Sequence, residues 1–146
     1  MLFNKKKLIY LLTYSGGIPF IIYAINSIFD YPKNYDQIIS SSIDIYSLLI
    51  ISFISGSHWG QSLKTDNKVN VLILSNVIVL GIWLAYIFQF YFKSIFLIAF
   101  TILLWIDYAY LLTEKINRWY LELRRNISLI VLLSLILGLI FWIFFL

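Results

Sequence analysis

The stretch Val69–Phe92 reads VNVLILSNVIVLGIWLAYIFQFYF and contains no charged side chain from its first residue to its last. A helix that crosses a bilayer needs about 20 predominantly apolar residues, because the hydrocarbon core is about 30 Å thick and each helical residue adds about 1.5 Å. This stretch is long enough to cross a bilayer once. It therefore predicts a transmembrane helix and decides the class of the fold.

Four further stretches have the same apolar character and a similar length. They lie at 8–29, 45–63, 94–113 and 126–146, and only Asp107 interrupts the stretch 94–113. Of the 146 residues, 62% are hydrophobic and 12% are charged, whereas soluble domains average about 45–50% apolar and about 25% charged residues. We predict an all-α polytopic membrane protein, with residues 1–146 forming a single domain, a bundle of five transmembrane helices in the lipid bilayer.

The first stretch follows three lysines, and a basic segment before an apolar one is also the plan of a cleaved signal peptide. The stretch is longer than the apolar part of a signal peptide and no A-x-A site follows it, which favours a helix that stays in the protein. Three residues in its middle disfavour a regular helix: Gly16, Gly17 and Pro19. We expect them to form a kink or a close contact between helices.

Lysine and arginine in short loops are retained on the cytoplasmic or matrix side of the membrane. With the N-terminus inside, the inside segments hold nine of the basic residues: Lys5, Lys6, Lys7, Lys64, Lys68, Lys115, Arg118, Arg124 and Arg125. The outside loops hold only Lys33 and Lys93. The charge pattern therefore predicts an N-terminus inside and a C-terminus outside. The formal net charge of +4 follows from this topology, so we expect no nucleic-acid partner.

The composition also restricts the chemistry of the protein. The chain has no cysteine and one histidine, His58, which excludes disulfides, thiolate metal sites, bis-histidine haem and a three-histidine zinc site. No stretch matches a P-loop, a Rossmann glycine run, a nucleophile elbow or a metal-binding helix motif. We expect no cofactor, no metal and no enzymatic activity.

Apart from tyrosines, only His58 and Asp107 are ionisable groups that lie well inside a predicted span. A charge near the bilayer centre costs at least about 2.5–3.5 kcal/mol, so such residues mark candidate functional sites. His58 precedes Lys64 by six residues and Asp107 precedes Glu114 by seven, which places them roughly 9 and 10 Å from the inner ends of their helices. The imidazole and the carboxylate are therefore predicted to lie at the same height, where they can pair.

Other polar residues are predicted to join this layer near the inner face. They are Ser55 on the span of His58, Asn76 on the third span, Ser15 on the first, and Glu122 and Arg124 at the mouth of the fifth. Ser55, Gln61 and Ser62 fall on the same side of their helix as His58. The opposite side carries the small residues Ser52, Gly56 and Gly60 at spacings of four, a pattern that lets another helix approach closely.

Two interpretations of the polar layer stay open at this point. Intramembrane histidine and aspartate often serve only as hydrogen-bond partners that hold helices together. The alternative is a proton relay or ligand site, because an imidazole changes its charge between about pH 5 and 8. A Ser55, His58 and Asp107 triad lacks identifiable oxyanion donors, so acyl transfer is not expected.

Several motifs resemble a family of multi-pass membrane proteins of unknown function. The sequences that carry the likeness are Gly17-Ile18-Pro19-Phe20, Ser52-Phe53, Gly56-Ser57-His58-Trp59-Gly60, Asp107 and Trp119-Tyr120-Leu121-x-Leu123-Arg124, in this order. The family includes vertebrate transmembrane protein 69. The resemblance implies an energy-transducing membrane, either a bacterial inner (plasma) membrane or a mitochondrial inner membrane, and it implies no activity.

Two functions from different classes fit this sequence. The first is a non-enzymatic accessory or assembly component of a membrane complex, which would have another membrane protein or further copies of itself as its partner. The second is a small proton-coupled transporter or permease that uses His58 and Asp107. The lack of soluble domains and catalytic motifs favours the first over the second.

Overall fold

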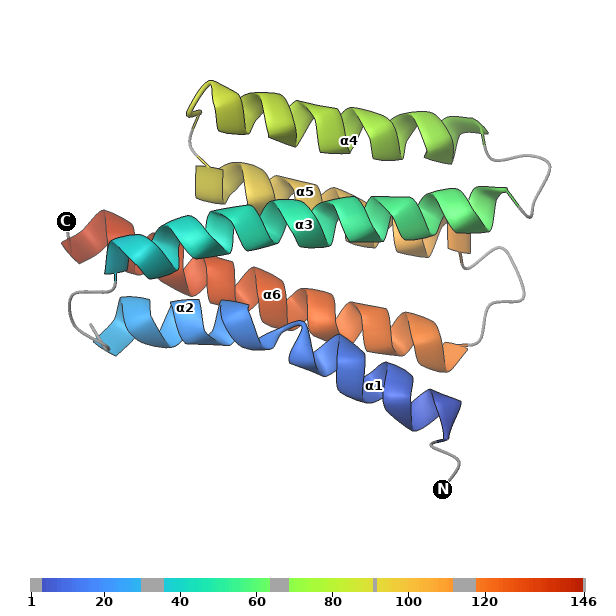
Figure 1. Ribbon diagram of the computed structural model, residues 1–146, viewed down its shortest axis with the longest axis horizontal. Coiled ribbons are helices and arrows are strands. Elements are labelled where there is room, and N and C mark those ends of the chain that lie inside the picture. The colour runs from blue at the N-terminus through green and yellow to red at the C-terminus, as the bar shows by residue number, and fades with distance from the viewer. Residues whose placement is uncertain (1–3, 30–35, 64–68, 91, 112–117, 146) are drawn as a thin grey trace. The chain divides into compact units, whose positions relative to one another are not determined.

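The computed structural model describes residues 4–29, 36–63, 69–90, 92–111 and 118–145. In chain order these form α1 (Lys5–Ser15), α2 (Ile18–Phe29), α3 (Asp36–Ser62), α4 (Val69–Ile87), α5 (Phe92–Ile106), the π-helix η1 (Asp107–Leu111) and α6 (Arg118–Phe145), as Figure 1 shows. The described ranges contain no strand, which confirms the all-α prediction. They form two compact units, one of Met1–Ile43 with Ile116–Leu146 and one of Asp44–Lys115.

Four helical segments are long and apolar enough to cross a membrane. They are Lys5–Phe29, Gln37–Ser62, Asn70–Ile87 and Arg118–Phe141. The predicted span 94–113 corresponds to α5, with 15 residues, and the 5 residues of η1 that continue it. Of the basic residues that predict the orientation, Lys33, Lys64, Lys68 and Lys115 lie outside the described residues.

The distribution of side chains differs from that in a soluble protein. Several hydroxyl groups are buried, on Ser47, Ser55, Ser75 and Ser134, while many large apolar side chains are exposed, among them Leu49, Phe53, Ile73, Val77 and Leu133. Large contiguous apolar surfaces are rare on soluble monomers. In a bilayer these side chains contact lipid, and the polar groups are placed inside. The chain is therefore built as a multi-pass membrane protein.

The helices do not end where the uncharged stretches end. The stretch 69–92 is uncharged throughout, but α4 ends at Ile87. Gln89 adopts a positive φ of 53°, and the Phe90 N–H donates to the Ala85 carbonyl 3.2 Å away. This is the hydrogen-bond pattern that closes many helices at a left-handed residue. Hydropathy alone does not detect such a turn.

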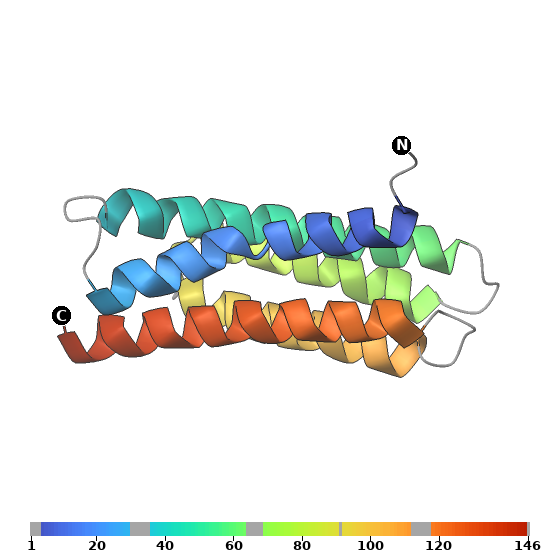
Figure 2. The same cartoon turned by 90° about the horizontal axis from the view of Figure 1, so that it is seen from below.

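In the first unit, the apolar stretch 8–29 is divided into two helices. α1 ends at Ser15 and α2 begins at Ile18, and Gly16 and Gly17 join them, as seen in Figure 2. Pro19 lies in the first turn of α2, where its missing N–H leaves no helical hydrogen bond unmade. A Cβ at Gly17 would lie 2.6 Å from Ile127 Cδ1. The break therefore coincides with a close contact against α6.

α2 also packs along the second half of α6. The Tyr23 ring lies directly over Gly138, so that a Cβ at this glycine would overlap ring atoms of Tyr23. Ser134 precedes Gly138 by one helical turn and is buried as well. Gly138 thus accepts an aromatic side chain against α6, and small residues allow helices to approach closely in this way in a membrane.

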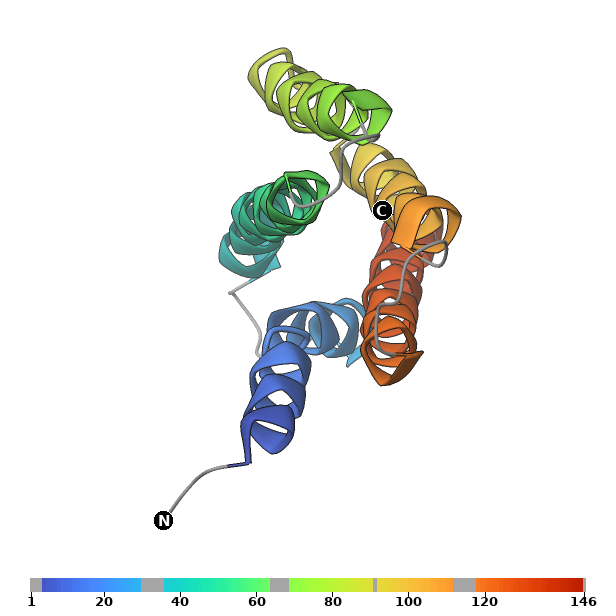
Figure 3. The ribbon, with the colours of Figure 1, turned by 90° about the vertical axis from the view of Figure 1, so that its right-hand side faces the viewer.

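In the second unit, α4 lies beside α5, as the end-on view in Figure 3 shows. The buried side of α5 is formed by large apolar residues at helical spacing: Phe96, Ala99, Phe100, Leu103 and Ile106. Asp107 follows directly in this series and is 2% exposed. The packed face of α5 is thus followed in sequence by the buried Asp107, which belongs to the candidate functional site.

The contact between Tyr23 and Gly138 generates a stability prediction. Gly138→Ala is expected to lower the free energy of unfolding by about 1–3 kcal/mol, because an added methyl group overpacks the contact with the ring. Gly81→Ala is the matched control, since no described atom lies within 4 Å of a Cβ at Gly81. Denaturant titration in detergent micelles checks both variants. Equal stability of Gly138→Ala and the wild type would contradict the close packing of α2 against α6.

Candidate functional site

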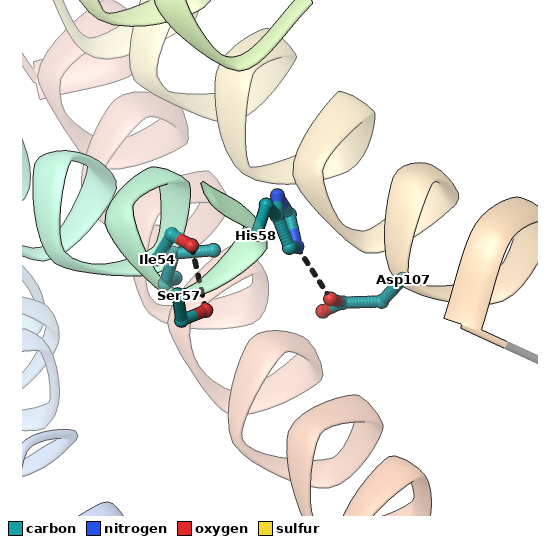
Figure 4. A network of polar contacts seen from close by, with 4 residues as sticks. All are labelled: Ile54, Ser57, His58 and Asp107. Atoms are coloured by element: carbon teal, nitrogen blue, oxygen red, sulfur yellow. Dashed lines mark hydrogen bonds and ion pairs between the residues drawn. The ribbon is translucent and has the colours of Figure 1, made fainter. Parts of the chain in front are cut away.

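The site is formed by one side chain from α3 and one from the start of η1. His58 Nε2 lies 2.7 Å from Asp107 Oδ1, and the two side chains are 0% and 3% exposed. Figure 4 shows them pointing toward one another. This separation is at the short end for a nitrogen–oxygen hydrogen bond and is typical of a charged donor or acceptor.

The backbone at Asp107 departs from the α-helix. α5 ends at Ile106, and the π-helix η1 begins at Asp107 itself. A π turn holds one more residue than an α turn, so it rotates the following side chains onto another face of the helix. Single π turns within α-helices are uncommon and occur frequently at functional sites. The carboxylate is therefore positioned by a backbone feature that ordinary helical packing does not require.

A second electrostatic interaction acts between α3 and α5. Lys93 near the start of α5 attracts the carboxylate of Asp44 on α3. The separation in sequence between Asp44 and His58 equals that between Lys93 and Asp107. The two helices are therefore parallel, with one pair at each end of a segment about 21 Å long. This register places the imidazole and the carboxylate at the same height.

The apolar surroundings restrict the charge of the His58–Asp107 pair. The pair has no net charge either as imidazolium with carboxylate or as neutral imidazole with carboxylic acid. Removing one proton leaves a net negative charge, which is costly in an apolar medium. The pair can therefore hold one exchangeable proton in its neutral state, and losing this proton changes the charge of the protein interior.

Two buried polar atoms of α3, one of them in the pair itself, have no hydrogen-bond partner among the described residues. They are His58 Nδ1 and Ser55 Oγ, and both side chains are buried. Three further such atoms lie on the same helix: Asp44 Oδ1, Ser47 Oγ and Gln61 Oε1. In contrast, the neighbouring Ser57 hydroxyl donates to the Ile54 carbonyl at 2.7 Å, as Figure 4 shows. Unsatisfied buried polar atoms are rare in native proteins and call for an explanation.

The structure does not bring Asn76 to the pair. Its side chain is exposed, and its Nδ2 donates to the Leu72 carbonyl of its own helix at 3.1 Å. The buried polar residue at this place on α4 is Ser75, whose hydroxyl donates to the same carbonyl. Ser75 and Asn76 are neighbours in sequence, so their side chains point in directions about 100° apart around the helix axis. The prediction from the sequence rests only on the depths of residues in the membrane, and depth does not give this direction.

Arg124 and Ser15 belong to the first unit. Arg124 is 7% exposed, and its guanidinium carbon lies 6.0 Å from the centre of the Tyr120 ring. Ser15 is exposed and donates to the Leu12 carbonyl. On the same end of this unit, Trp119 stacks on Tyr10 at 5.8 Å and receives Lys6 over its face. These aromatic and basic residues join α1 to α6.

The small-residue surface of α3 is exposed. It is formed by Ser52, Gly56 and Gly60, and no described atom lies within 4 Å of a Cβ at either glycine. Within the described residues of its own unit, the surface is therefore free of contacts with other helices at these glycines. The small residues that do accept a neighbouring side chain are Gly17 and Gly138. Gly138 was not predicted, although Ser134 and Gly138 have the same spacing of four.

The described residues offer no metal site, since they contain no group of three or more histidine, aspartate or glutamate side chains close together. The chemistry available at His58 and Asp107 is that of a single imidazole and a single carboxylate. These groups can exchange a proton or accept and donate hydrogen bonds.

Comparison with known proteins gives a family but no activity. The model of the family described as "Protein of unknown function (DUF3429)" matches residues 5–140. No curated protein and no solved structure gives a significant match. The matched range includes every described helix except the last residues of α6, and it contains both members of the pair. The chain therefore belongs to the DUF3429 family.

Proposed function

We propose that this protein is a small proton-coupled carrier or permease in which His58 and Asp107 form the proton-binding site. The observation that carries the proposal is the 2.7 Å contact between these two buried side chains, with His58 Nδ1 left without a partner among the described residues. An imidazole changes its charge near neutral pH, so it can load and release protons under physiological conditions.

The unpartnered atoms distinguish this role from a purely structural one. A hydrogen bond that only holds two helices together is most stable when every buried polar atom is paired. Within the described chain, one ring nitrogen is paired with Asp107, while the other ring nitrogen and the Ser55 hydroxyl are not paired. This arrangement leaves atoms available to a proton donor or acceptor that is not part of the fold.

The charge of the pair gives a mechanism for coupling. Loss of the proton leaves a net negative charge among apolar residues such as Leu103 and Ile106, which costs free energy unless a cation or water compensates it. The deprotonated pair therefore favours a conformation that admits water or a cationic substrate. The neutral pair favours a closed conformation. Proton binding then drives the change in access.

The topology that we propose has five spans, with α5 and η1 together forming the fourth. The N-terminus lies inside and the C-terminus outside, as the excess of lysine and arginine in the inside segments indicates. An energy-transducing bacterial or mitochondrial inner membrane supplies the proton gradient. Because five helices are few for a carrier, a homodimer is the expected form in the membrane.

Protonation of the pair is measurable as charge movement. On a solid-supported membrane, a pH jump applied to proteoliposomes of the wild type is expected to give a transient current, because the proton binds inside the membrane. Asp107→Asn and His58→Gln are expected to reduce this current at least about tenfold, because each variant removes one of the two groups that hold the proton. Size-exclusion chromatography checks that both variants stay folded.

Asn76→Ala is the matched control for these variants, because Asn76 is also a polar residue within a span but its side chain bonds to its own helix. It is expected to keep the current of the wild type. Equal currents from Asp107→Asn, His58→Gln and the wild type would rule out the pair as the proton-binding site.

The second candidate function is that of a non-enzymatic accessory or assembly component of a membrane complex. It is favoured by the surface of Ser52, Gly56 and Gly60, which is exposed and has the spacing of helix-packing motifs. A helix of a partner chain would fit against this surface. The two functions differ in the partner that they require. The accessory role requires a different protein chain, bound in fixed stoichiometry, whereas the carrier role does not.

The accessory role predicts a loss of complex formation when the small-residue surface is filled. Gly56→Leu with Gly60→Leu is expected to release the protein from its native complex, because the added side chains prevent close helix approach. Native mass spectrometry of mildly solubilised membranes measures this. Gly81→Leu is the control, since Gly81 is also an exposed glycine within a helix. A wild type that is only a monomer or homodimer in native membranes would exclude the accessory role.

A further inference from the structure

Three of the unpartnered atoms of α3 belong to evenly spaced residues, with His58 in the middle. Ser55, His58 and Gln61 are three residues apart, a spacing that places side chains next to one another on one side of a helix. Ser55 Oγ, His58 Nδ1 and Gln61 Oε1 are all buried atoms without a hydrogen-bond partner in the described chain. His58 therefore precedes Gln61 and follows Ser55 by about one helical turn each.

The hydrogen-bonding roles of the three atoms complement one another. In both neutral forms of the pair the Nδ1 atom carries a hydrogen, because Nε2 either donates to Asp107 as part of an imidazolium or accepts from the protonated carboxyl. Nδ1–H is then a donor without an acceptor among the described residues. Gln61 Oε1 is an acceptor without a donor there, and the Ser55 hydroxyl can act as either.

A single water molecule has the hydrogen-bonding capacity to pair with all three atoms. Its oxygen accepts from the Nδ1–H of His58, and its two hydrogens donate to Gln61 Oε1 and Ser55 Oγ. Buried waters in proteins typically make about three hydrogen bonds to polar groups that otherwise lack partners. Water is small enough to lie between side chains of adjacent helical turns. Because the His58–Asp107 pair is neutral, an uncharged molecule can occupy the site and no ion is needed to balance a charge.

We infer that Ser55, His58 and Gln61 form a water-binding site through which the His58–Asp107 pair exchanges its proton at Nδ1. When the proton leaves, it passes from Nδ1 to this water, the remaining ring hydrogen stays on Nε2 and donates to the Asp107 carboxylate, and Nδ1 keeps the lone pair. Uptake is the reverse transfer. Asp107 thus holds the ring and does not itself face the proton pathway. The proton-exchange role rests on the proposed function. The water site does not, because it is inferred only from the three unpartnered atoms.

The sole histidine makes the site directly observable. With 15N-labelled histidine, solid-state NMR of proteoliposomes gives one Nδ1 signal and one Nε2 signal, both from His58. Transfer into deuterium oxide is expected to exchange the Nδ1 hydrogen at once, because the site holds water in contact with the bulk. The Nε2 hydrogen is expected to exchange more slowly, since it lies in the hydrogen bond to Asp107.

The variants Ser55→Ala and Gln61→Met remove the two groups that hold the water and keep a similar volume. Each is expected to slow exchange at Nδ1 about tenfold, the factor for one hydrogen bond of ordinary strength. Ser57→Ala is the control, because that hydroxyl already bonds to the Ile54 carbonyl. It is expected to leave the exchange unchanged. The Nε2 signal shows in each variant that the bond to Asp107 persists.

The outcomes separate the water site from the proposed function. An Nδ1 hydrogen that stays protected in the wild type, or exchange that is the same in all variants, would overturn the inference, even where a pH jump still gives a current. Rapid Nδ1 exchange that slows in Ser55→Ala and Gln61→Met supports the water site. If the wild type then gave no pH-jump current, the water site would stand and the carrier function would be wrong.

Discussion

The cost of placing ionisable groups among apolar side chains is the constraint on which the rest of this structure depends. An isolated charge in the hydrocarbon core is unfavourable, and His58 and Asp107 avoid this by forming a 2.7 Å contact that is neutral as a pair. This contact joins α3 to the end of α5. The charge of Lys93 near the start of α5 also acts on the Asp44 carboxylate of α3, about 21 Å along the helices from this contact.

The same constraint explains where function resides in a chain without soluble domains. Large apolar side chains face outward, and the buried positions of α3 include Ser47, Ser55 and His58. Burial of polar groups is costly unless they are paired, so polar groups left unpaired point to water or to a substrate. A proton is the simplest substrate that such a cluster can bind, because its transfer needs only one acceptor and a hydrogen-bonded water.

Sequence reasoning predicted the helical class and the common depth of His58 and Asp107, because both follow from the rise per residue and from the positions of charged residues. It did not predict which side of each helix faces inward, since hydropathy does not fix rotation about the helix axis. Asn76 was expected near the pair for this reason, whereas its side chain is exposed. The π turn at Asp107 and the Tyr23 contact with Gly138 depend on tertiary packing, for which a single sequence gives no direct indication.

A double-mutant cycle on stability measures whether His58 and Asp107 act as one unit. The free energy of unfolding in micelles is measured for His58→Ala, Asp107→Ala and the double variant. If the side chains are paired, the double variant loses less stability than the sum of the single variants, by about 0.5–3 kcal/mol. Losses that add to within about 0.5 kcal/mol would show that the two groups do not interact and would contradict this account.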